Sequence, residues 1–410
     1  MKKRSPVYGK RGRLERPIRD SLAHLPHRPP YPLPIATSMS PLRSFVSHVL
    51  LVMTTLSASA TPLLVFVGTY TGTSSRGIYA TRFDPAKGTF SEPVLAAETP
   101  NPSFLGVSPD LKVLYAVNES PSGVRAYSIS ATGSLSPLGE GSSDIVGPCD
   151  VAADPSGRLV AVANYSGGSV AAFRVLPDGA LGERTALLLH PGKSINPQRQ
   201  EKAHAHGVTF SRDGRYLVVP DLGIDQVKVY AVDRDAATLR PQASADLAIA
   251  PGSGPRHAAF SRDGKQLYVI NELSSTITVA NYDPSSGSLH TIQTISTLPK
   301  DNAVASSTAE IAVHPGDRFV YGSNRGHDSI AVFERDPRSG TLSLVEITPT
   351  GGKTPRHFTL SPDGAWLIAA NQESDTLTVF SVNPRSGKLT PTSHQISIPR
   401  PVCVRFVAQP

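Results

Sequence analysis

Residues 255–282 read PRHAAFSRDGKQLYVINELSSTITVANY. The stretch contains three short runs rich in apolar, aromatic and β-branched residues, HAAF, QLYVI and TITVANY, which are typical of β-strands. The Asp-Gly pair between the first two runs favours a tight hairpin turn. The stretch therefore predicts three consecutive antiparallel strands joined by short turns.

The same pattern recurs along the chain from residue 102 onward. Each copy can be aligned at a proline or its equivalent, which opens a short apolar strand; the anchors are Pro102, Pro148, Ala205, Pro255, Thr308, Pro355 and Pro401. A turn, a second strand and a third strand follow each of the first six anchors. A period of roughly fifty residues with several short strands per copy is typical of the blades of a β-propeller.

The two ends of the repeat region are incomplete copies that complement each other. The last copy has only a first strand, PVCVRFV (401–407), whereas the region after residue 60 starts with a second strand, LLVFVGTYT (63–71), and a third, GIYATRFDP (77–85). Joined in one sheet, they complete a composite blade and close the ring, which removes exposed strand edges. The predicted fold class is therefore all-β, a seven-bladed β-propeller whose N- and C-terminal strands close one blade.

Residues 1–60 are predicted to be an N-terminal extension and a signal peptide. Met39 is followed by a basic residue, by the largely apolar run FVSHVLLVMTTL (45–56) and by an Ala-Ser-Ala sequence ending at Ala60, which is the arrangement of a secretory signal. We expect translation to start at Met39, cleavage after Ala60 and export to the periplasm or the cell exterior. Residues 61–410 then form the propeller, with no membrane attachment after cleavage.

The formal net charge of +7 is concentrated in this N-terminal segment. Residues 1–60 hold ten basic and two acidic residues, so residues 61–410 carry a formal net charge of −1. A nucleic-acid-binding domain would be expected to carry a basic surface of its own. We therefore expect no nucleic-acid partner.

The chain has two cysteines, Cys149 and Cys403. Each follows an anchor, near the start of a first strand, and the two blades are two positions apart in the ring. A disulfide requires the two Cα atoms to lie within about 7 Å of each other. We therefore expect two separate thiols despite the predicted export. Because no third His or Cys stands at ligand spacing near the His-x-His pair, we expect neither a metal ion nor another cofactor.

Comparison of the copies with one another separates structural positions from functional ones. Sixteen residues after the anchor, each intact copy carries a short polar residue that we expect to hydrogen-bond the following turn: Asn118, Asn164, Asp221, Asn271, Asn324 and Asn371. The next position varies: Glu119, Tyr165, Leu222, Glu272, Arg325 and Gln372. The two positions after the anchor collect charge, namely His206, Arg256, His257, Glu310, Arg356 and His357. Ring closure should bring these groups together at one mouth of the central channel.

Several stretches resemble the propeller-type lactonase family, which includes bacterial 6-phosphogluconolactonase of propeller type and the fungal 3-carboxy-cis,cis-muconate lactonising enzyme. The similar stretches are KAHAHGVTF (202–210), GSGPRHAAF (252–260), INELSSTI (270–277), STAEIAVHP (307–315), GSNRGHDSIAVF (322–333) and TPRHFTLSPDG (354–364). The resemblance covers about residues 63–407. Because the family fold supports both a hydrolase and a cyclase, membership does not fix the reaction.

The resemblance also implies an active site. Its residues would be a His of the His-x-His strand, the Arg of GPRH, the Glu of NEL and the Arg of SNR, which correspond here to His204 or His206, Arg256, Glu272 and Arg325. Ala205 stands where the family has a proline, so the choice between the two histidines stays open. Further candidates for substrate binding are His204, His257, Glu310, Arg356 and His357. His257 and His357 could instead serve only to hydrogen-bond a neighbouring blade.

Lactone hydrolysis independently calls for these types of residue. His206 or Glu272 can serve as general base for a water molecule, because histidine titrates near neutrality and burial can tune a carboxylate. Arg256 and Arg325 offer forked donors to an oxyanion or to an anionic substrate group. No nucleophile elbow or Ser-His-Asp spacing is evident, which favours direct attack by water.

The leading functional hypothesis is hydrolysis of a sugar lactone, as by a 6-phosphogluconolactonase. The alternatives are a muconate-type lactonising cyclase and a non-catalytic exported propeller that binds a ligand or a protein. The expected partner is a small-molecule lactone or an anionic sugar acid, and we expect the protein to be a monomer.

Overall fold

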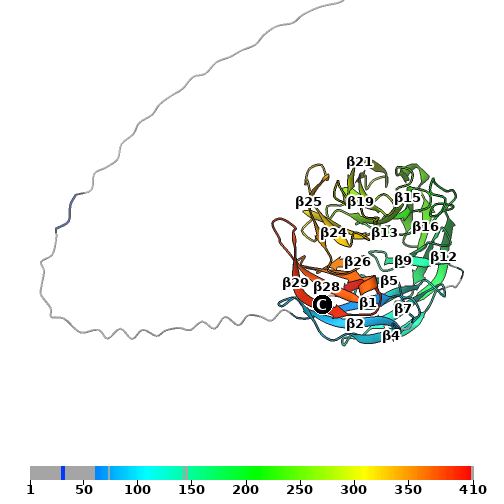
Figure 1. Ribbon diagram of the computed structural model, residues 1–410, viewed down its shortest axis with the longest axis horizontal. Helices are drawn as coiled ribbons and strands as arrows, with labels where there is room; N and C mark the ends of the chain where they lie inside the picture. The colour runs from blue at the N-terminus through cyan, green and yellow to red at the C-terminus, as the bar shows by residue number, and fades with distance from the viewer. Residues whose placement is uncertain (1–28, 33–60, 73, 142–143, 145, 408–410) are drawn as a thin grey trace, which may run out of the picture. The chain divides into compact units, whose positions relative to one another are not determined.

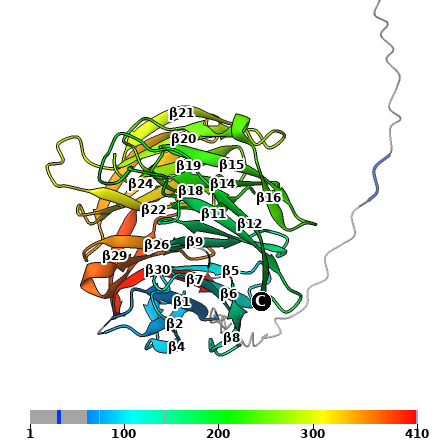
Figure 2. The same ribbon diagram turned by 90° about the vertical axis from the view of Figure 1, so that its right-hand side faces the viewer.

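The computed structural model describes residues 29–32, 61–72, 74–141, 144 and 146–407. From residue 61 onward these residues form seven antiparallel sheets, of which five have four strands and two have five. The sheets surround a central axis as the blades of a propeller (Figures 1 and 2). The predicted all-β, seven-bladed β-propeller is therefore confirmed.

Among the described residues no helix is long and apolar enough to cross a membrane. The predicted start at Met39 and the cleavage site after Ala60 lie outside the described residues.

The first strands of the blades are β5 (Phe104–Val107), β9 (Pro148–Ala153), β13 (Thr209–Phe210), β18 (Pro255–Phe260), β22 (Ser307–Val313), β26 (Pro355–Leu360) and β30 (Pro401–Val407). First strands of neighbouring blades contact one another from β18 through β22, β26, β30 and β5 to β9, and thus surround the axis. The second strands are β1 (Leu63–Thr69), β6 (Val113–Asn118), β10 (Leu159–Asn164), β14 (Tyr216–Asp221), β19 (Gln266–Asn271), β23 (Phe319–Arg325) and β27 (Trp366–Asn371). The third strands are β2 (Gly77–Asp84), β7 (Gly123–Ile129), β11 (Ser169–Val175), β15 (Gln226–Asp233), β20 (Thr276–Tyr282), β24 (Ser329–Arg335) and β28 (Thr376–Val382).

Each blade also has a fourth, outermost strand, whereas three strands per copy were predicted. Five of these are continuous: β8 (Leu135–Glu140), β12 (Leu181–Leu189), β21 (Leu289–Ser296), β25 (Leu342–Pro349) and β29 (Leu389–Ser397). The other two are interrupted: β3 (Thr89–Phe90) with β4 (Val94–Glu98), and β16 (Thr238–Pro241) with β17 (Leu247–Ala248). One-turn 3₁₀ helices occur at Ala243–Ala245 and Gln372–Ser374. The outermost strands are half exposed and polar, as in LHTIQTIS of β21, so their apolar signal is weak.

The composite blade is formed as predicted. Strand β1 pairs antiparallel with β30 on one side and with β2 on the other. The register places Leu64 opposite Val407 and Val67 opposite Val404. Cys403 of β30 and Cys149 of β9 are both buried free thiols, which confirms the prediction that they are not linked.

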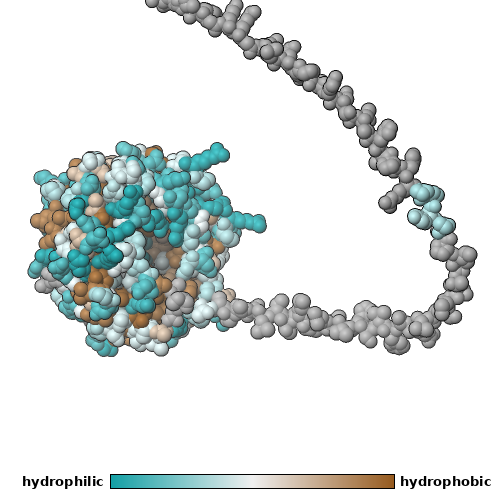
Figure 3. Space-filling view, turned by 180° about the vertical axis from the view of Figure 1, so that it is seen from behind, coloured by the Kyte–Doolittle hydropathy of each residue, from teal (hydrophilic) through white to brown (hydrophobic). Residues whose placement is uncertain are grey.

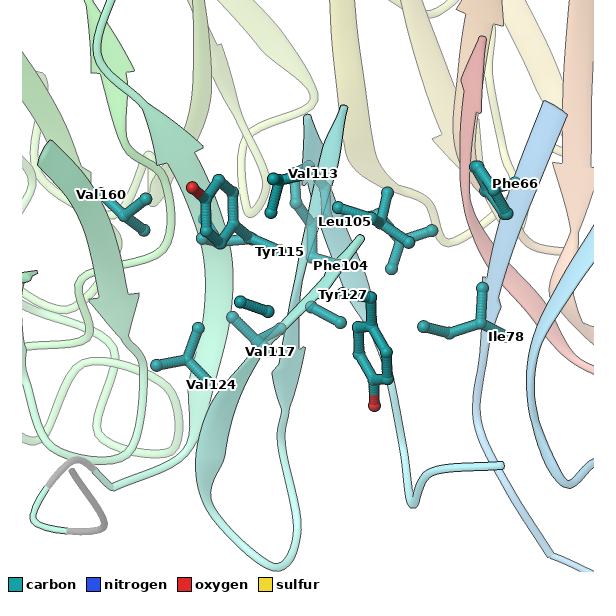
Figure 4. Packing of buried hydrophobic residues seen from close by; sticks show 14 of the residues in the cluster. Phe66, Ile78, Phe104, Leu105, Val113, Tyr115, Val117, Val124, Tyr127 and Val160 are labelled. Carbon is teal, nitrogen blue, oxygen red and sulfur yellow. The ribbon is translucent and has the colours of Figure 1, made fainter. Parts of the chain in front are cut away.

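The hydrophobic core lies between blades rather than in one central region. In the cluster of Figure 4, Phe66 and Ile78 of the composite blade pack beside Leu105 and Tyr127 of the next blade. Each blade therefore presents apolar side chains on both faces of its sheet and hydrophilic ones toward solvent. On the face seen in Figure 3, hydrophilic side chains predominate and hydrophobic ones form patches.

A repeated hydrogen bond ties neighbouring blades together. Tyr115, Tyr268 and Tyr321 occupy matching places in second strands and are almost fully buried. Each hydroxyl donates to a glycine carbonyl in a hairpin of the next blade, at 2.9 Å: Gly179, Gly340 and Gly387, respectively. A buried hydroxyl without a partner would be costly, so these hydrogen bonds fix the spacing of the blades. Each hydrogen bond contributes about 1 kcal/mol to the stability of the fold.

We expect the ring to depend on β30. A chain that ends at Arg400 leaves one edge of β1 unpaired and exposes the apolar residues that β30 covers, so its melting temperature should fall sharply and it should aggregate. Thermal melting and size-exclusion chromatography measure both effects. As a control, Ser397→Asp on the exposed end of β29 should behave like the unchanged protein. Unaltered melting of the truncated chain would contradict the closure by β30.

Candidate active site

The turns that follow the second strands open onto a cavity of about 280 Å³ at one end of the ring. It is lined by Glu119, Cys149, Tyr165, Arg199, His206, Glu272, Ser307, Arg325 and Arg356. A narrow extension adds Ser103, Phe104, Arg256 and Val402 and shares Glu119, Cys149 and Arg356. A groove of about 330 Å³ beside β4 and β8 is larger, but its charged residues are only Glu98, Arg125 and Glu140. The gathering of charged groups, rather than volume, therefore identifies the candidate site.

Buried amides hold the turns that present the cavity residues. The side chains at the end of the second strand donate across the turn to hydroxyl groups of the third strand: Asn164 to Ser169 (3.1 Å), Asn271 to Thr276 (2.9 Å), Asn324 to Ser329 (3.1 Å) and Asn371 to Thr376 (3.3 Å). The predicted structural role of this position is thus supported. The residues that follow Asn118, Asn164, Asn271 and Asn324, namely Glu119, Tyr165, Glu272 and Arg325, line the cavity.

Glu272 lies at the centre of a cluster of arginines. Its Oε2 is 3.0 Å from Arg256 Nε and 2.9 Å from Arg325 Nη2. Its Oε1 accepts a hydrogen bond of 2.6 Å from Arg199 Nη2. Burial alone would raise the pKa of Glu272, but the three guanidinium groups hold that pKa at about 2. Glu272 is therefore ionised at neutral pH and is a poor proton acceptor.

The guanidinium N–H groups of Arg256 donate to groups of the protein itself. Its side chain is only 4% exposed, and besides Glu272 it donates to the Ala309 carbonyl at 2.7 Å from Nη1. Arg325 is less enclosed and lines the cavity, although its Nη2 is shared between Glu272 and the Thr308 carbonyl at 2.8 Å. Burial lowers the pKa of Arg325 to about 10, which still leaves the group charged at neutral pH.

His206 is the histidine of the His-x-His pair that faces the cavity. Its Nε2 lies 3.9 Å from Glu272 Oε2, and its Nδ1 lies 3.8 Å from the Cys149 sulfur. Burial, with the positive charge of Arg256 and His257, holds the pKa of His206 well below its usual 6.5. Burial likewise raises the pKa of the Cys149 thiol well above 9. Both groups are therefore neutral near pH 7.

His204 does not line the cavity. Its ring stacks on Tyr165 with centroids 4.4 Å apart, its Nδ1 lies 3.0 Å from the Tyr165 carbonyl, and its Nε2 lies 3.1 Å from Glu201 Oε1. Its backbone N–H donates to Asp221 at 2.7 Å. His204 thus supports the wall residue Tyr165, and His206 is the member of the pair that lines the cavity.

His257, Glu310 and His357 gather as predicted, but they form a buried cluster that does not line the cavity. His257 Nδ1 lies 3.0 Å and His357 Nε2 lies 3.4 Å from Glu310 Oε2. Burial lowers the pKa of His357 to about 3, so its neutral Nδ1 can accept from the Val404 N–H at 3.3 Å. The cluster joins first strands of different blades. This arrangement fits the alternative that His257 and His357 serve to hydrogen-bond a neighbouring blade.

Arg356 differs from the other arginines of the site. It lines both the cavity and its extension and lies over the Tyr70 ring, with 5.4 Å from its Cζ to the centroid. No carboxylate of the described residues lies within ion-pair distance of it. The cavity and extension together hold four arginines against two glutamates, Glu119 and Glu272. The site is therefore built to receive a negative charge.

Residues 64–406 match the family model described as lactonase, 7-bladed beta-propeller. The chain belongs to this lactonase family. It is 38% identical over 352 residues to the 6-phosphogluconolactonase of Bacillus subtilis strain 168, covering 85% of this chain and 99% of that protein. It is 33% identical over 316 residues to a 6-phosphogluconolactonase of Formosa agariphila, covering 74% of this chain and 88% of the relative. The solved structure of the periplasmic gluconolactonase of Pseudomonas aeruginosa superposes with a TM-score of 0.80 at 34% identity, covering 85% of this chain and 100% of that one.

Several residues around the site of this lactonase-family protein were not predicted. Arg199 lies on the loop between β12 and β13, in the longest of the repeat units. The extra length of this unit could have indicated a loop that contributes to the site. Glu119 and Tyr165 occupy the variable position that also supplies Glu272 and Arg325, so the repeat comparison contained them. Ser307 and Tyr70 carried no comparable signal in the sequence.

The low pKa of Glu272 predicts that the free energy of unfolding of this lactonase-family protein decreases at acidic pH. The pKa falls from 4.5 to about 2 on folding, so the ionised carboxylate stabilises the fold above pH 4.5, and this stabilisation is lost as the pH falls toward 2. The Glu272→Gln variant should have a lower free energy of unfolding than the unchanged protein. The difference between the two proteins should be about 2 kcal/mol smaller at pH 3 than at pH 7. Denaturant titration at both pH values measures this.

The matched control for this measurement is Glu98→Gln, which removes an exposed ion pair with Arg76. Its free energy of unfolding should differ little from that of the unchanged protein at both pH values, because exposed ion pairs contribute little. A Glu272→Gln difference that is independent of pH would show that the guanidinium groups do not depress the Glu272 pKa.

Proposed function

We propose that the protein hydrolyses a sugar lactone, with a 6-phosphogluconolactone-like compound as substrate. The observation that carries the proposal is the surplus of arginine over glutamate around the cavity, where the Arg356 guanidinium group has no carboxylate partner in the described part of the chain. The names of the Bacillus and Pseudomonas relatives, 6-phosphogluconolactonase and gluconolactonase, support a lactone as substrate. Lactone opening converts a neutral carbonyl into an oxyanion, for which such a site is suited.

The arginines divide into two groups by their contacts. Arg199, Arg256 and Arg325 are anchored on Glu272, whose carboxylate holds their orientation. Arg356 has no carboxylate partner among the described residues and lines the cavity, so its forked donors are available to the oxyanion that forms at the lactone carbonyl. Arg199 is 40% exposed and comes from a loop, and its donors that do not meet Glu272 can bind a fixed negative group such as a phosphate at the mouth.

The reaction needs a general base to remove a proton from water. Glu272 is unsuited to this step, because protonating it would leave the cationic groups of Arg199, Arg256 and Arg325 without their shared anion. Its proposed role is instead to position Arg256 and Arg325. This assignment removes Glu272 from the two general-base candidates, His206 and Glu272, that the sequence suggested.

The proposed function is tested with the purified protein and a panel of lactones. 6-Phosphogluconolactone, glucono-δ-lactone and a lactone without hydroxyl groups are compared by the rate of acid release over the uncatalysed rate. Catalysis of the sugar lactones is the expected result. Acid release at the uncatalysed rate for every compound would exclude a lactonase and would favour a ligand-binding propeller.

In the same assay, Arg356→Lys should lower kcat/KM about 100-fold although the charge is retained, because lysine cannot reproduce the two-donor fork. The control is Arg400→Lys, because Arg400 also lies over the Tyr70 ring, at 5.6 Å, but is exposed and does not line the cavity. Equal activity of the two variants would contradict the role of Arg356.

We also propose that the protein is exported. The predicted signal in residues 39–60 and the periplasmic location of the Pseudomonas relative support this proposal. N-terminal sequencing of the protein recovered from the periplasm or medium should begin at Thr61. Recovery of the protein only from the cytoplasm, with residues before Thr61 retained, would contradict it.

A further inference from the structure

Glu119 is a second carboxylate of the cavity, and its surroundings differ from those of Glu272. It follows β6 at the position of the repeat that Glu272 occupies after β19. It lines both the cavity and the narrow extension. Its Oε2 accepts a hydrogen bond of 2.8 Å from the Tyr70 hydroxyl. Among the described residues no Arg, Lys or His lies within ion-pair distance of its carboxylate.

The other groups able to accept a proton in the cavity are less suited to that role. Glu272 holds three guanidinium groups at 2.6–3.0 Å. The His206 ring is buried, its Nδ1 lies 3.8 Å from the Cys149 sulfur, and burial with the charge of Arg256 holds its pKa well below 6.5, which makes it a weak base. The Cys149 sulfur is itself within 3.5 Å of the Ala205 and His206 carbonyls, to which its S–H can donate. Only Glu119 offers the cavity a carboxylate with an oxygen, Oε1, that has no partner among the described residues.

The geometry points to Glu119 as the catalytic general base of the lactonase, with Tyr70 as the residue that positions it. This inference rests on the proposed function. Because Glu119 and Arg356 both line the cavity of about 280 Å³, a water molecule on Glu119 and a carbonyl oxygen on Arg356 can belong to one reacting centre. Proton removal and oxyanion stabilisation are thereby supplied from neighbouring walls of one space.

The proposed reaction accounts for each atom and proton. Glu119 takes one proton from water while the water oxygen bonds to the lactone carbonyl carbon, and the carbonyl oxygen becomes the oxyanion. When the oxyanion collapses, the bond between that carbon and the ring oxygen breaks. The ring oxygen takes the proton from the Glu119 carboxylic acid and becomes a hydroxyl group. The new carboxylic acid then ionises and releases its proton to solvent, and Glu119 returns to its ionised form.

Tyr70 is well placed to hold Glu119 without exchanging protons with it. Burial raises the pKa of Tyr70 to about 12, so its hydroxyl stays protonated and donates. The Tyr70 ring is flanked by the guanidinium groups of Arg356 and Arg400, at 5.4 and 5.6 Å from its centroid. Its backbone N–H donates to the Arg400 carbonyl at 3.1 Å. The composite blade thereby contributes the support for a carboxylate that belongs to the next blade.

The test compares Glu119→Gln with the unchanged full-length protein, using 6-phosphogluconolactone and glucono-δ-lactone. We expect kcat to fall about 100-fold or more, because glutamine keeps the size of the side chain but cannot accept the proton. The melting temperature should change little, because Glu119 holds no buried arginine. The control is Glu140→Gln, the same substitution on the outermost strand of the same blade, where Glu140 pairs with Arg125. That variant should retain the rate of the unchanged protein.

Tyr70→Phe provides a second, independent measurement. The Tyr70 hydroxyl holds the Glu119 carboxylate by a hydrogen bond of 2.8 Å, and phenylalanine keeps the aromatic ring beside Arg356. Removal of the hydroxyl should therefore lower kcat about tenfold with little change in KM, because the general base is misplaced while the arginines that bind the substrate stay in position. A purely structural role of Tyr70 would lower the melting temperature and leave kcat per folded molecule unchanged. This variant decides the assignment if Glu119→Gln fails to fold.

Each outcome has a defined meaning. Sugar-lactone hydrolysis by the unchanged protein, loss of kcat in Glu119→Gln and a lowered kcat at unchanged KM in Tyr70→Phe together support the inference. If the unchanged protein is active and Glu119→Gln stays within about threefold of its rate, the Glu119 assignment is overturned and the proposed function stands. An unchanged kcat of Tyr70→Phe overturns the assignment as well. If the unchanged protein hydrolyses no lactone, both the proposed function and this inference fall.

Discussion

The antiparallel pairing of β1 with β30 is the interaction on which the rest of the structure depends. Each blade buries its faces against two neighbours, so a row of blades leaves two unburied faces unless its ends meet. The Leu64–Val407 and Val67–Val404 register provides that meeting in one continuous sheet. Every first strand then surrounds a common axis, and the turns of all seven blades reach the same mouth. The cavity therefore exists only because two strands from opposite ends of the domain share a blade.

The active site arises where equivalent positions of the repeat carry different residues. A buried Asn or Asp precedes the variable position in every intact copy. The choice of Glu, Tyr or Arg at that position therefore determines which groups line the mouth. Glu272 and Glu119 illustrate the point. Glu272 is surrounded by arginines, whereas Glu119 accepts a hydrogen bond from the Tyr70 hydroxyl.

The sequence was sufficient to predict the fold and some of the residues of the candidate site. Strand runs and turn signals of residues 255–282 recur in register, so blade number and the composite blade followed from spacing alone. The outermost strands were missed because only one of their faces is partly buried, as in β21. Arg199 was missed because its loop has no counterpart in the other copies. The choice between His204 and His206, and the burial of His257 and His357, depended on side-chain packing across blades, which spacing does not encode.

The two unlinked cysteines have a practical consequence. Cys149 and Cys403 are buried on different first strands, and burial raises the pKa of Cys403 to about 12. Neither thiol is a ready nucleophile for disulfide exchange, because the thiolate is the reactive form. The propeller therefore reaches its native state without an oxidant or a disulfide isomerase. The redox potential of the compartment then places no constraint on where the polypeptide folds, and production in a reducing or an oxidising compartment should yield a propeller with the same two free thiols.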